Sequence, residues 1–336
     1  MKKLDGKVIV MYADCKITRG VVKCTIVDIT RKRLFELPIE VADVIESIIN
    51  TKGGSRIYEP AITNDVINFL IYEELAFWTD TPNAFPAISE DVAVRSRLTN
   101  ALIDIKDTIH DLHYILPQLD ALGCEMLQIR FFRSYPIGVI QGIVDKVTES
   151  NIRSLDLYLQ SDGLNHEDIV SLLSKYGVIS NFVLFNARDN NVLKLESGTI
   201  LNADQYINVR QEMNSCEDCG YISKRSFHIG DVRTFNEYKL MNSCLSRKVS
   251  IDEMGQVCNC PAIRSKFGYY SEVNIKDIVT EPAFMKYEKL NKDSILVCKD
   301  CEYRYVCTDC RAITQGDGNY GKPTNCSYDP YTGEWT

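Results

Sequence analysis

Residues 99–132 read TNALIDIKDTIHDLHYILPQLDALGCEMLQIRFF and predict a strand, a helix and a second strand in succession. The apolar runs TNALIDI (99–105) and EMLQIRFF (125–132) are typical of buried strands, and the segment at about 107–121 between them has helical spacing. Two more such strands follow at RSLDLYLQ (153–160) and VISNFVLF (178–185), with helical patterns at about 137–149 and 165–176. Strands that alternate with helices indicate parallel pairing with helices on the faces of the sheet. The predicted fold class is therefore α/β.

Residues 86–210 hold four of these strands, about half the number in a (β/α)8 barrel. We therefore predict a truncated barrel or a small open α/β sheet over this range. The sequence contains no G-x-G-x-x-G and no G-x4-G-K-[ST] pattern at the end of a strand. No motif therefore indicates nucleotide binding.

Residues 1–85 predict a separate α+β module. KVIVMYA (7–13) and VVKCTIVDI (21–29) are rich in β-branched residues, and RKRLFEL (31–37) is expected to close a hairpin with the second of them. Helical spacing follows at 39–49 and 64–74, and LAFWTD (75–80) is expected to form a short wing strand. This order is typical of a winged-helix-like module. The segment DTPNAFPAI (80–88), with two prolines, is the expected linker.

Composition narrows the class of protein. The chain has 336 residues, 45% hydrophobic and 25% charged, which is ordinary for a globular protein of two or three domains. A net charge of -8 and the lack of a basic stretch argue against a nucleic-acid partner. The sequence has no apolar run near the ~20 residues of a membrane span, and its N-terminus does not read as an export signal. We therefore expect a cytoplasmic protein without a membrane partner.

The thirteen cysteines are distributed unevenly, since ten of them lie between residues 216 and 326. In a reducing compartment, clustered thiols indicate metal or catalytic ligands rather than disulfides. The scattered Cys15, Cys24 and Cys124 are expected to be core residues. Residues 211–336 have short, poorly periodic elements, so we expect this segment to be held together by metal.

The densest cysteine motif is VCKDCEYRYVCTDC (297–310), which spaces its thiols as C-x2-C-x5-C-x2-C. A C-x2-C turn directs two thiolates at one metal. The central gap is short for a zinc ribbon, whose pairs are about 15–20 residues apart. With Cys326 and the upstream cysteines, the chain has more thiols than one four-ligand ion uses, whereas iron–sulfur clusters take four each. Zinc remains the alternative, because thiolates bind both.

Two half-motifs resemble the SPASM domain, which binds auxiliary [4Fe-4S] clusters in radical SAM enzymes that modify peptides. One is SILVCKDCEYRYVCTDCRAI with the later KPTNCSYDPYTGEW, and the other is Cys244, ten residues, Gly255, four residues and Cys260. The chain departs from the family pattern by having two residues, not three, between Cys307 and Cys310.

The resemblance implies two [4Fe-4S] clusters. The second cluster would be held by Cys298, Cys301, Cys307 and Cys326. The first would be held by Cys244, Cys260 and Cys310 together with Cys219 or Cys216 of SCEDCG. Cys258 is left out of both sets. The alternative for SCEDCG is a thioredoxin-like redox pair, but no strand–CxxC–helix context is evident.

The C-x3-C-x2-C motif that binds the SAM-cleaving cluster occurs nowhere in the chain. This combination resembles the SPASM-domain peptide maturation proteins of grasp-with-spasm systems, which accompany an ATP-grasp ligase and a short precursor peptide. It implies an iron–sulfur protein that recognises a ribosomally synthesised precursor and supports its modification. The alternative is a non-catalytic, metal-stapled adaptor that delivers the peptide to the ligase. Neither hypothesis names a catalytic residue.

The resemblance also implies that the N-terminal module binds the leader of the precursor. Such modules pair an extended peptide with a strand and hold its side chains in apolar pockets. The candidate peptide-binding residues on this basis are Leu34, Phe35, Val66, Phe69 and Leu70. The other interpretation of these residues is plain core packing.

His110 and His113 stand three residues apart and could form half of a metal site. No carboxylate motif of the metalloprotease type accompanies them. We therefore predict that both lie on an exposed helix face.

Overall fold

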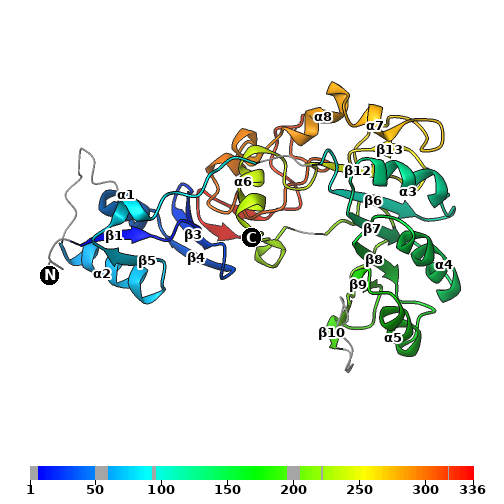
Figure 1. Cartoon of the computed structure of the whole chain (residues 1–336), viewed down its shortest axis with the longest axis horizontal. Helices are drawn as coiled ribbons and strands as arrows, with labels where there is room; N and C mark the ends of the chain where they lie inside the picture. Colours follow the sequence, from blue (N-terminus) through cyan, green and yellow to red (C-terminus); the bar gives the residue numbers. More distant parts are fainter. Residues whose placement is uncertain (1–6, 50–59, 93–95, 195–204, 221, 317) are drawn as a thin grey trace. The chain divides into compact units, whose positions relative to one another are not determined.

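The computed structural model describes residues 7–49, 60–92, 96–194, 205–220, 222–316 and 318–336. The chain divides into two compact units (Figure 1). Unit 1 contains residues 1–93, 221–243 and 290–336, and unit 2 contains residues 94–220 and 244–289. Neither unit is one continuous segment. The boundaries of the three consecutive domains expected from the sequence therefore remain a prediction.

Unit 2 is built on an eight-stranded, mostly parallel sheet in the order β10-β11-β9-β8-β7-β6-β12-β13. Its central strands are β6 (Asn100–Ile105), β7 (Met126–Phe131), β8 (Ser154–Gln160) and β9 (Ile179–Phe185). They pair in parallel, which confirms the α/β class and a sheet consistent with a partial barrel. The flanking strands are β10 (Asn191–Lys194), β11 (Gln205–Asn208), β12 (Lys248–Ile251) and β13 (Val257–Cys258).

The helices α3 (Leu112–Ala121), α4 (Ile137–Thr148) and α5 (His166–Lys175) cover one face of this sheet (Figure 1). Asp111 accepts a hydrogen bond from His113 N at the start of α3, and Asn165 accepts one from Asp168 N at the start of α5. Alternate strand residues meet the helices, because side chains of a strand point to opposite faces in turn. This core includes Ile103, Ile129, Leu157, Ile115, Val144 and Leu172, all at most 1% exposed.

The opposite face of the sheet is polar. Asn100, Met126 and Ser154 are aligned across β6, β7 and β8, and Leu102, Gln128 and Asp156 form the next row. Asp104, Arg130 and Tyr158 form a third row, and Lys248 of β12 pairs with Asn100. Several polar side chains of the central strands are therefore aligned on this face of the sheet.

Unit 1 begins with a small α+β module. Strand β1 (Val8–Met11) pairs antiparallel with β5 (Ala76–Thr79), and β2 (Cys15–Arg19), β3 (Lys23–Asp28) and β4 (Arg33–Pro38) form a three-stranded antiparallel sheet. Helices α1 (Ile39–Ile49) and α2 (Pro60–Tyr72) pack on this module. The expected β3–β4 hairpin is confirmed. The expected first strand (7–13) corresponds to β1 and the expected second strand (21–29) to β3, whereas β2, which follows a turn at residues 13–14, was not predicted.

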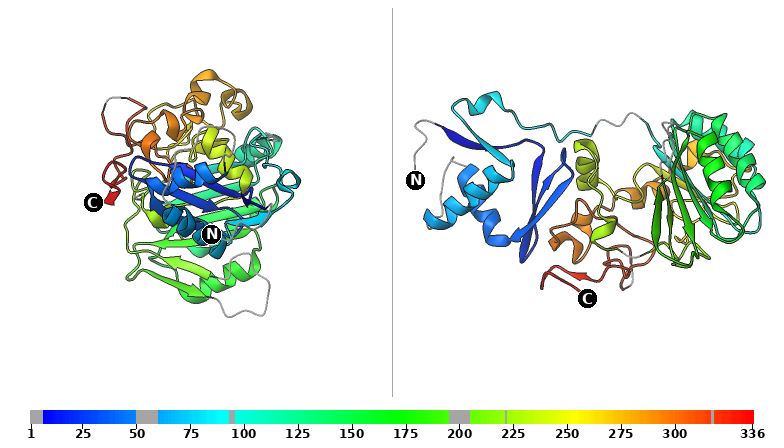
Figure 2. Two further views of the ribbon diagram at one scale, coloured as in Figure 1. Left: turned by 90° about the vertical axis from the view of Figure 1, so that its left-hand side faces the viewer. Right: turned by 90° about the horizontal axis from the view of Figure 1, so that it is seen from below.

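The β2-β3-β4 sheet is covered on both faces (Figure 2). Ile26 and Phe35 face α1 and α2, whereas Val27 and Leu34 face the cysteine-rich residues that include Tyr303. Thr25 Oγ1 donates a hydrogen bond to Glu302 O at 2.8 Å. Gly20 lies so close to Glu302 that an added Cβ would be 2.9 Å from the Glu302 backbone nitrogen. The N-terminal module and the C-terminal segment therefore share a core.

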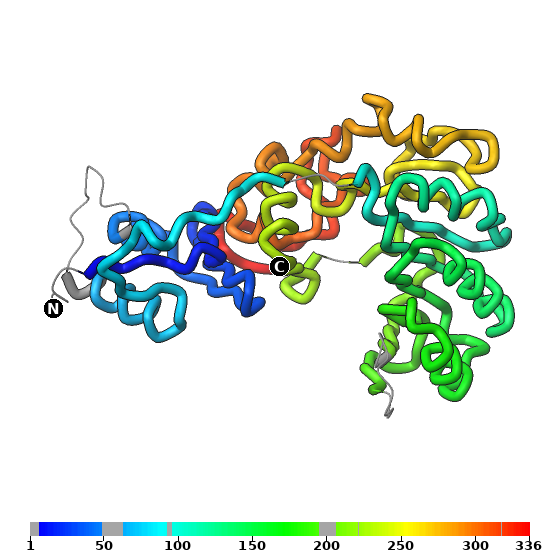
Figure 3. Tube along the Cα trace, in the orientation of Figure 1, coloured from blue at the N-terminus to red at the C-terminus, as the bar shows by residue number. Residues whose placement is uncertain are grey.

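The remaining part of unit 1 is poor in regular structure. Residues 222–243 lie beside residues 290–336 (Figure 3), and Ile222 and Phe235 join the cluster around Tyr303. The short elements of the two units are η1 (Pro82–Ala84), η2 (Lys224–Ser226), α6 (Val232–Leu240), α7 (Ile275–Ile278), α8 (Pro282–Glu288), η3 (Lys292–Ser294), η4 (Cys298–Asp300), β14 (Tyr328–Asp329) and β15 (Glu334–Trp335). No helix in the described ranges has the length and apolarity that a membrane span requires.

Candidate functional site

In unit 1, a tight turn presents the first thiols of the densest cysteine motif. Cys298 and Cys301 bracket the 3-10 turn η4, which Cys301 N closes by donating to Cys298 O at 3.0 Å. Val297 enters this turn with φ 68° and ψ −47°, in the sterically costly region of the classic γ-turn. A β-branched residue in this region is a local strain of the kind that occurs at ligand clamps.

Lys292 connects the thiols to a buried charge network. Its side chain is 4% exposed, and Nζ donates to Cys307 Sγ at 3.5 Å and lies 3.4 Å from Asp309 Oδ1. Asp309 also accepts hydrogen bonds from Arg311 Nη2 at 2.6 Å and Asn242 Nδ2 at 2.6 Å. Asp309 and Arg311 are 0% and 4% exposed. A carboxylate buried this deeply needs polar partners, and here two hydrogen bonds from Arg311 and Asn242 and the ion pair with Lys292 provide them.

The thiols predicted for the second cluster interact electrostatically in this unit. Burial first, and then the neighbouring Cys326, raise the pKa of Cys307, and Cys307 adds to the effect of burial on the pKa values of Cys298 and Cys301. Burial raises the pKa of the Cys298 thiol to about 11, although Lys292 lowers it. Burial also lowers the pKa of Lys292, but Cys307 and Asp309 outweigh it and raise that pKa above its ordinary value. Burial therefore favours the neutral form of the Cys298 and Cys301 thiols by raising the pKa of each.

Aromatic rings cover this region. Tyr303 is 1% exposed, and its ring centroid lies 5.0 Å from that of Tyr328 and 4.8 Å from that of Phe227. Trp335 stacks beside Tyr328 at 4.9 Å. These rings pack against Cys301, Cys307 and Cys326 and shield this part of the cysteine motif from water.

In unit 2, a second charge network lies on the polar face of the sheet. Arg130 Nε and Nη2 donate to Asp104 Oδ1 and Oδ2 at 2.7 Å each, and Arg130 Nη1 donates to Cys219 Sγ at 3.7 Å. Arg130 is 4% exposed and Asp104 is 0% exposed. Lys248, partly buried, has Nζ 3.9 Å from Cys244 Sγ and also interacts electrostatically with Cys260 and Cys219.

Local structure explains how these cysteines reach the sheet. Gln160 Nε2 donates to Met213 O at 2.7 Å and ties the segment that leads to Cys216 and Cys219 to the end of β8. Asp218 Oδ2 accepts from Ser215 N at 3.0 Å and closes the SCEDCG turn. Cys260 follows the β12–β13 hairpin, whose turn contains Gly255 at φ +80°.

Cys258 differs from its neighbours. It is fully buried on β13, and its thiol donates to Ser250 O at 3.6 Å. This contact is that of a small core residue. The scattered Cys15, Cys24 and Cys124 are also buried, at 7%, 0% and 0% exposure, as expected.

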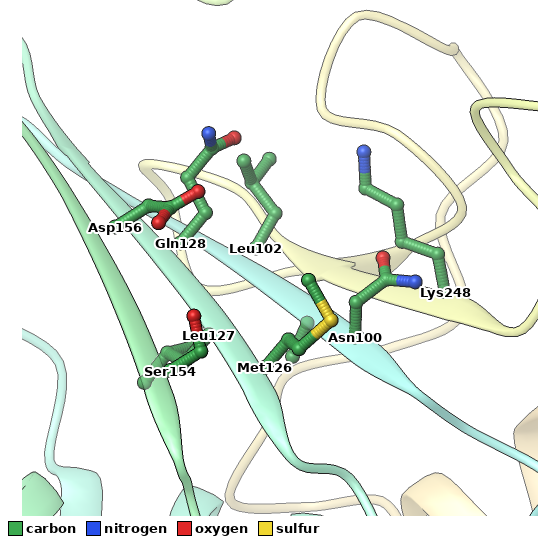
Figure 4. A pocket seen from close by; sticks show the side chains of 9 residues that line it. Asn100, Leu102, Met126, Leu127, Gln128, Ser154, Asp156 and Lys248 are labelled. Carbon is green, nitrogen blue, oxygen red and sulfur yellow. The ribbon is translucent and has the colours of Figure 1, made fainter. Parts of the chain in front are cut away.

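A pocket of about 150 Å³ with a mixed polar and apolar lining lies on the same face of unit 2 (Figure 4). Its lining combines amides, a hydroxyl, a carboxylate and an ammonium with a few apolar side chains: Asn100, Ala101, Leu102, Met126, Leu127, Gln128, Ser154, Asp156 and Lys248. Burial raises the pKa of Asp156, and its hydrogen bond from Asn181 Nδ2 at 2.7 Å opposes this effect. Lys248 belongs to both the pocket and the thiol network, so the two are adjacent.

The sequence did not single out the residues of these networks. Lys248, Lys292, Arg130, Asp104, Asp309 and Arg311 are ordinary surface types by composition, and only burial distinguishes them. A weak signal was present for two of them, because Asp309 and Arg311 flank Cys310 inside the motif.

Among the described residues, no three histidine, cysteine, aspartate or glutamate side chains are placed so as to hold one metal ion. The ligand sets expected from the sequence therefore remain predictions. All four thiols of the second set are residues of unit 1, and four of the five candidates for the first set, Cys216, Cys219, Cys244 and Cys260, are residues of unit 2. Cys310 is a residue of unit 1.

The residues expected to bind a peptide do not form one groove. Val66 and Leu70 are 6% and 0% exposed in the core of the N-terminal module, and Phe35 packs edge-to-face on Phe69 at 5.7 Å. Leu34 lies on the other face of β4, toward Tyr303. Their role in peptide binding remains a prediction, and the partly exposed Phe35 and Phe69 are the members that a peptide could contact without moving the core.

The N-terminal module has a groove that is larger than the pocket of unit 2. It measures about 390 Å³ and is lined by β1, β2, Ile45 and the linker residues Phe85, Pro86 and Ala87. Phe85 packs on Phe77 with ring centroids 4.7 Å apart. The sequence predicted a linker at this point but not its contact with the strands.

His110 and His113 do not share a helix face. His110 precedes α3 and is 3% exposed, with Nε2 3.0 Å from Asp104 O and 2.9 Å from Asp252 O. His113 is exposed in the first turn of α3. The prediction of an exposed face was therefore wrong for His110, because Leu112 and not His110 begins the helix.

No protein-family model and no curated protein matches this chain. Solved structures of Streptococcus suis SuiB are weakly similar. SuiB alone gives a TM-score of 0.42 at 10% identity over 94% of this chain and 99% of SuiB, and SuiB bound to S-adenosylmethionine gives 0.41 at 10% identity over the same shares. SuiB bound to its precursor peptide SuiA gives 0.43 at 11% identity over 95% of this chain and 100% of SuiB. Scores at this level establish neither a common fold nor a common function.

Proposed function

We propose that this chain is an iron–sulfur protein that takes part in the maturation of a ribosomally synthesised peptide. It recognises the precursor through its N-terminal module and supports the modification of that peptide with a partner ATP-grasp ligase. The cysteine spacing of the SPASM-like motifs is the basis of this proposal. The structural observation that supports it best is that each group of thiols lies against a buried or partly buried lysine.

The residues present fit anionic thiolate clusters. In each unit an ammonium group lies at a cysteine sulfur, Lys292 at Cys307 in unit 1 and Lys248 at Cys244 in unit 2, and such a cation favours an anionic thiolate. Cys298, Cys301, Cys307 and Cys326 would hold one [4Fe-4S] cluster. Cys244, Cys260 and Cys310, with Cys219 or Cys216, would hold the other. Such clusters supply one-electron transfer when bound.

The chain's own residues would have distinct tasks. The strained turn at Val297 orients Cys298 and Cys301, Lys292 donates to Cys307 Sγ, and the rings of Tyr303 and Tyr328 exclude water. In unit 2 the Asp104–Arg130 pair orients an N–H group toward Cys219. We assign no SAM-dependent step, because the chain has no C-x3-C-x2-C motif.

The test is a metal analysis. The full chain is purified without oxygen, and iron, acid-labile sulfide and zinc are measured per chain. We expect about eight irons with matching sulfide, as two four-iron clusters require. Cys307→Ser is expected to remove about half of the iron, whereas Cys124→Ala, which changes a buried cysteine in the core of unit 2, leaves the iron content unchanged. Wild-type protein with neither iron nor sulfide would contradict the proposal.

The second candidate is a non-catalytic adaptor, in which metal serves only to fold the cysteine-rich segment and the chain delivers the peptide to the ligase. The poverty of regular structure in residues 290–336 supports it, since such segments often depend on metal for stability. Zinc without sulfide favours the adaptor. A visible spectrum that changes reversibly on dithionite reduction favours the redox protein.

A further inference from the structure

The two thiol groups share an arrangement of charged side chains that the cysteine motif does not contain. In unit 1, Lys292 and Arg311 flank Asp309, and Lys292 Nζ lies 3.5 Å from Cys307 Sγ. In unit 2, Arg130 pairs with Asp104 and donates to Cys219 Sγ at 3.7 Å, while Lys248 lies 3.9 Å from Cys244 Sγ. Each group thus has a lysine, an arginine and an aspartate, with a cation directed at sulfur.

A count of charges alone does not assign these sites. In unit 1, Lys292 and Arg311 face Asp309, and the buried Glu302 beside Cys301 is a second acidic residue, to which the Tyr328 hydroxyl donates a hydrogen bond. In unit 2, Arg130 pairs with Asp104, and Lys248 Nζ lies at Cys244 Sγ. What each lysine provides is a charged N–H donor directly at a cysteine sulfur, and such a donor favours an anionic sulfur.

We infer that Lys292 and Lys248 are positioning residues that raise the reduction potentials of the two clusters, one lysine for each cluster. This rests on the proposed function, since it requires that the thiols bind iron–sulfur clusters. An external one-electron donor adds one negative charge to a cluster without forming or breaking a bond. An ammonium group at a ligand sulfur stabilises that added charge, because hydrogen bonds and nearby positive charge favour the reduced state.

Because Lys292 is more deeply buried than Lys248, we expect it to have the larger effect on the reduction potential of its cluster. Its side chain is 4% exposed and its contact with Cys307 is screened from water, whereas Lys248 is only partly buried. Electrostatic interactions are larger where solvent does not screen them. Removal of Lys292 should therefore lower the reduction potential of its cluster by more than removal of Lys248 lowers the potential of the other cluster.

The experiment compares four single variants of the full chain with the wild type. Lys292→Met and Lys248→Met each remove one ammonium. Lys292→Arg keeps the charge and the donor, and Lys16→Met removes a lysine of β2 whose side chain has no contact with sulfur among those described. Iron and sulfide are measured first, and each reduction is then followed by EPR and visible absorption over a range of applied potentials.

The expected result is a separate effect of each lysine. Lys292→Met makes the reduction of one cluster less favourable by about tenfold or more, a shift of about 59 mV for a one-electron couple, and leaves the other cluster unchanged. Lys248→Met lowers the reduction potential of the other cluster by a smaller amount. Lys292→Arg restores most of the wild-type potential, and Lys16→Met behaves as the wild type.

The experiment distinguishes a failure of the proposed function from a failure of the inference about the lysines. Wild-type protein without iron and sulfide contradicts the proposed function, and the inference fails with it. Clusters present in all variants with unchanged potentials contradict the inference alone. If Lys292→Met does not assemble its cluster, Lys292→Arg decides: a potential close to that of the wild type supports the charge role, and a cluster lost in this variant as well contradicts it.

Discussion

At the scale of single residues, Asp156 lies on the polar face of unit 2 with an amide as its partner. Its carboxylate accepts a hydrogen bond from Asn181, and in the part of the chain that the structure describes it forms no ion pair. Burial raises the pKa of this carboxyl above its ordinary value. The folded state therefore binds this proton more tightly than the unfolded state, and ionisation of Asp156 at neutral pH costs stability.

Asp156→Asn is expected to stabilise the protein at neutral pH. The amide keeps an acceptor for Asn181 and carries no charge to desolvate. Because the pKa is raised, the penalty in the wild type is absent below the unfolded pKa of about 4 and grows as pH rises through the folded pKa. Thermal unfolding should give a higher Tm for the variant at pH 7 and equal Tm values near pH 4.

Asp162→Asn is the matched control for this comparison, since Asp162 is exposed in the turn before α5. Its Tm should follow that of the wild type at both pH values. A lower Tm for Asp156→Asn at pH 7 would show instead that the carboxylate has an ionic role in the pocket, as a binding site for a cationic group would require.

At the scale of elements, the β12–β13 hairpin determines where Cys260 lies. Gly255 has φ +80° in its turn, and an added Cβ would collide with the Tyr269 ring. Only glycine adopts this conformation without strain. The glycine between Cys244 and Cys260 in the sequence motif is therefore required by the conformation of this turn, which leads the chain through Cys258 to Cys260.

Gly255→Ala is expected to lower the free energy of unfolding by about 1–3 kcal/mol, the cost of a strained backbone residue. It should also reduce the iron content of the first thiol group, since Cys260 is displaced. Chemical denaturation and iron analysis measure the two effects. Gly142→Ala is the control: nothing lies within 4 Å of a Cβ at this position of α4, so it should stabilise by about 0.5–1 kcal/mol. Equal stability of both variants would argue against the proposed role of the turn.

At the scale of the whole molecule, unit 1 combines three separate stretches of chain. Val27 and Leu34 of the N-terminal sheet are packed against Tyr303 and Val306, next to Cys307. Lys23 Nζ also donates to Gly333 O at 2.5 Å. The N-terminal module is therefore part of the structure that surrounds the cysteine motif.

A chain truncated to residues 94–336 tests this arrangement. We expect it to keep the parallel sheet of unit 2, whose residues it retains, but to bind a hydrophobic dye and to lose the iron of the Cys298–Cys326 group. Circular dichroism, dye fluorescence and iron analysis measure these outcomes. A truncated chain with full iron content and no exposed apolar surface would mean that the N-terminal module is energetically independent.

Periodicity predicted much of unit 2 correctly. Four strands and three helices lie within a few residues of their expected ranges: β6, β7, β8, β9, α3, α4 and α5. Their apolar residues recur at the spacing of a strand or a helix, and this local pattern indicates the element and its buried face without knowledge of the tertiary contacts. The added strands β11 and β12 were not predicted. Their sequences are short, and their pairing depends on partners such as β9 and β6 that are far away in the chain.

The sequence by itself determined the α/β class, the parallel core and the concentration of thiols, since these follow from local hydrophobic pattern and from spacing. Only the tertiary structure decided which charged residues face those thiols. Lys292 and Arg311 are separated by nineteen residues, and Arg130 and Lys248 by 118, yet each pair shares one network. Spacing is a property of the chain, whereas the burial that gives a charge its strength is a property of the fold.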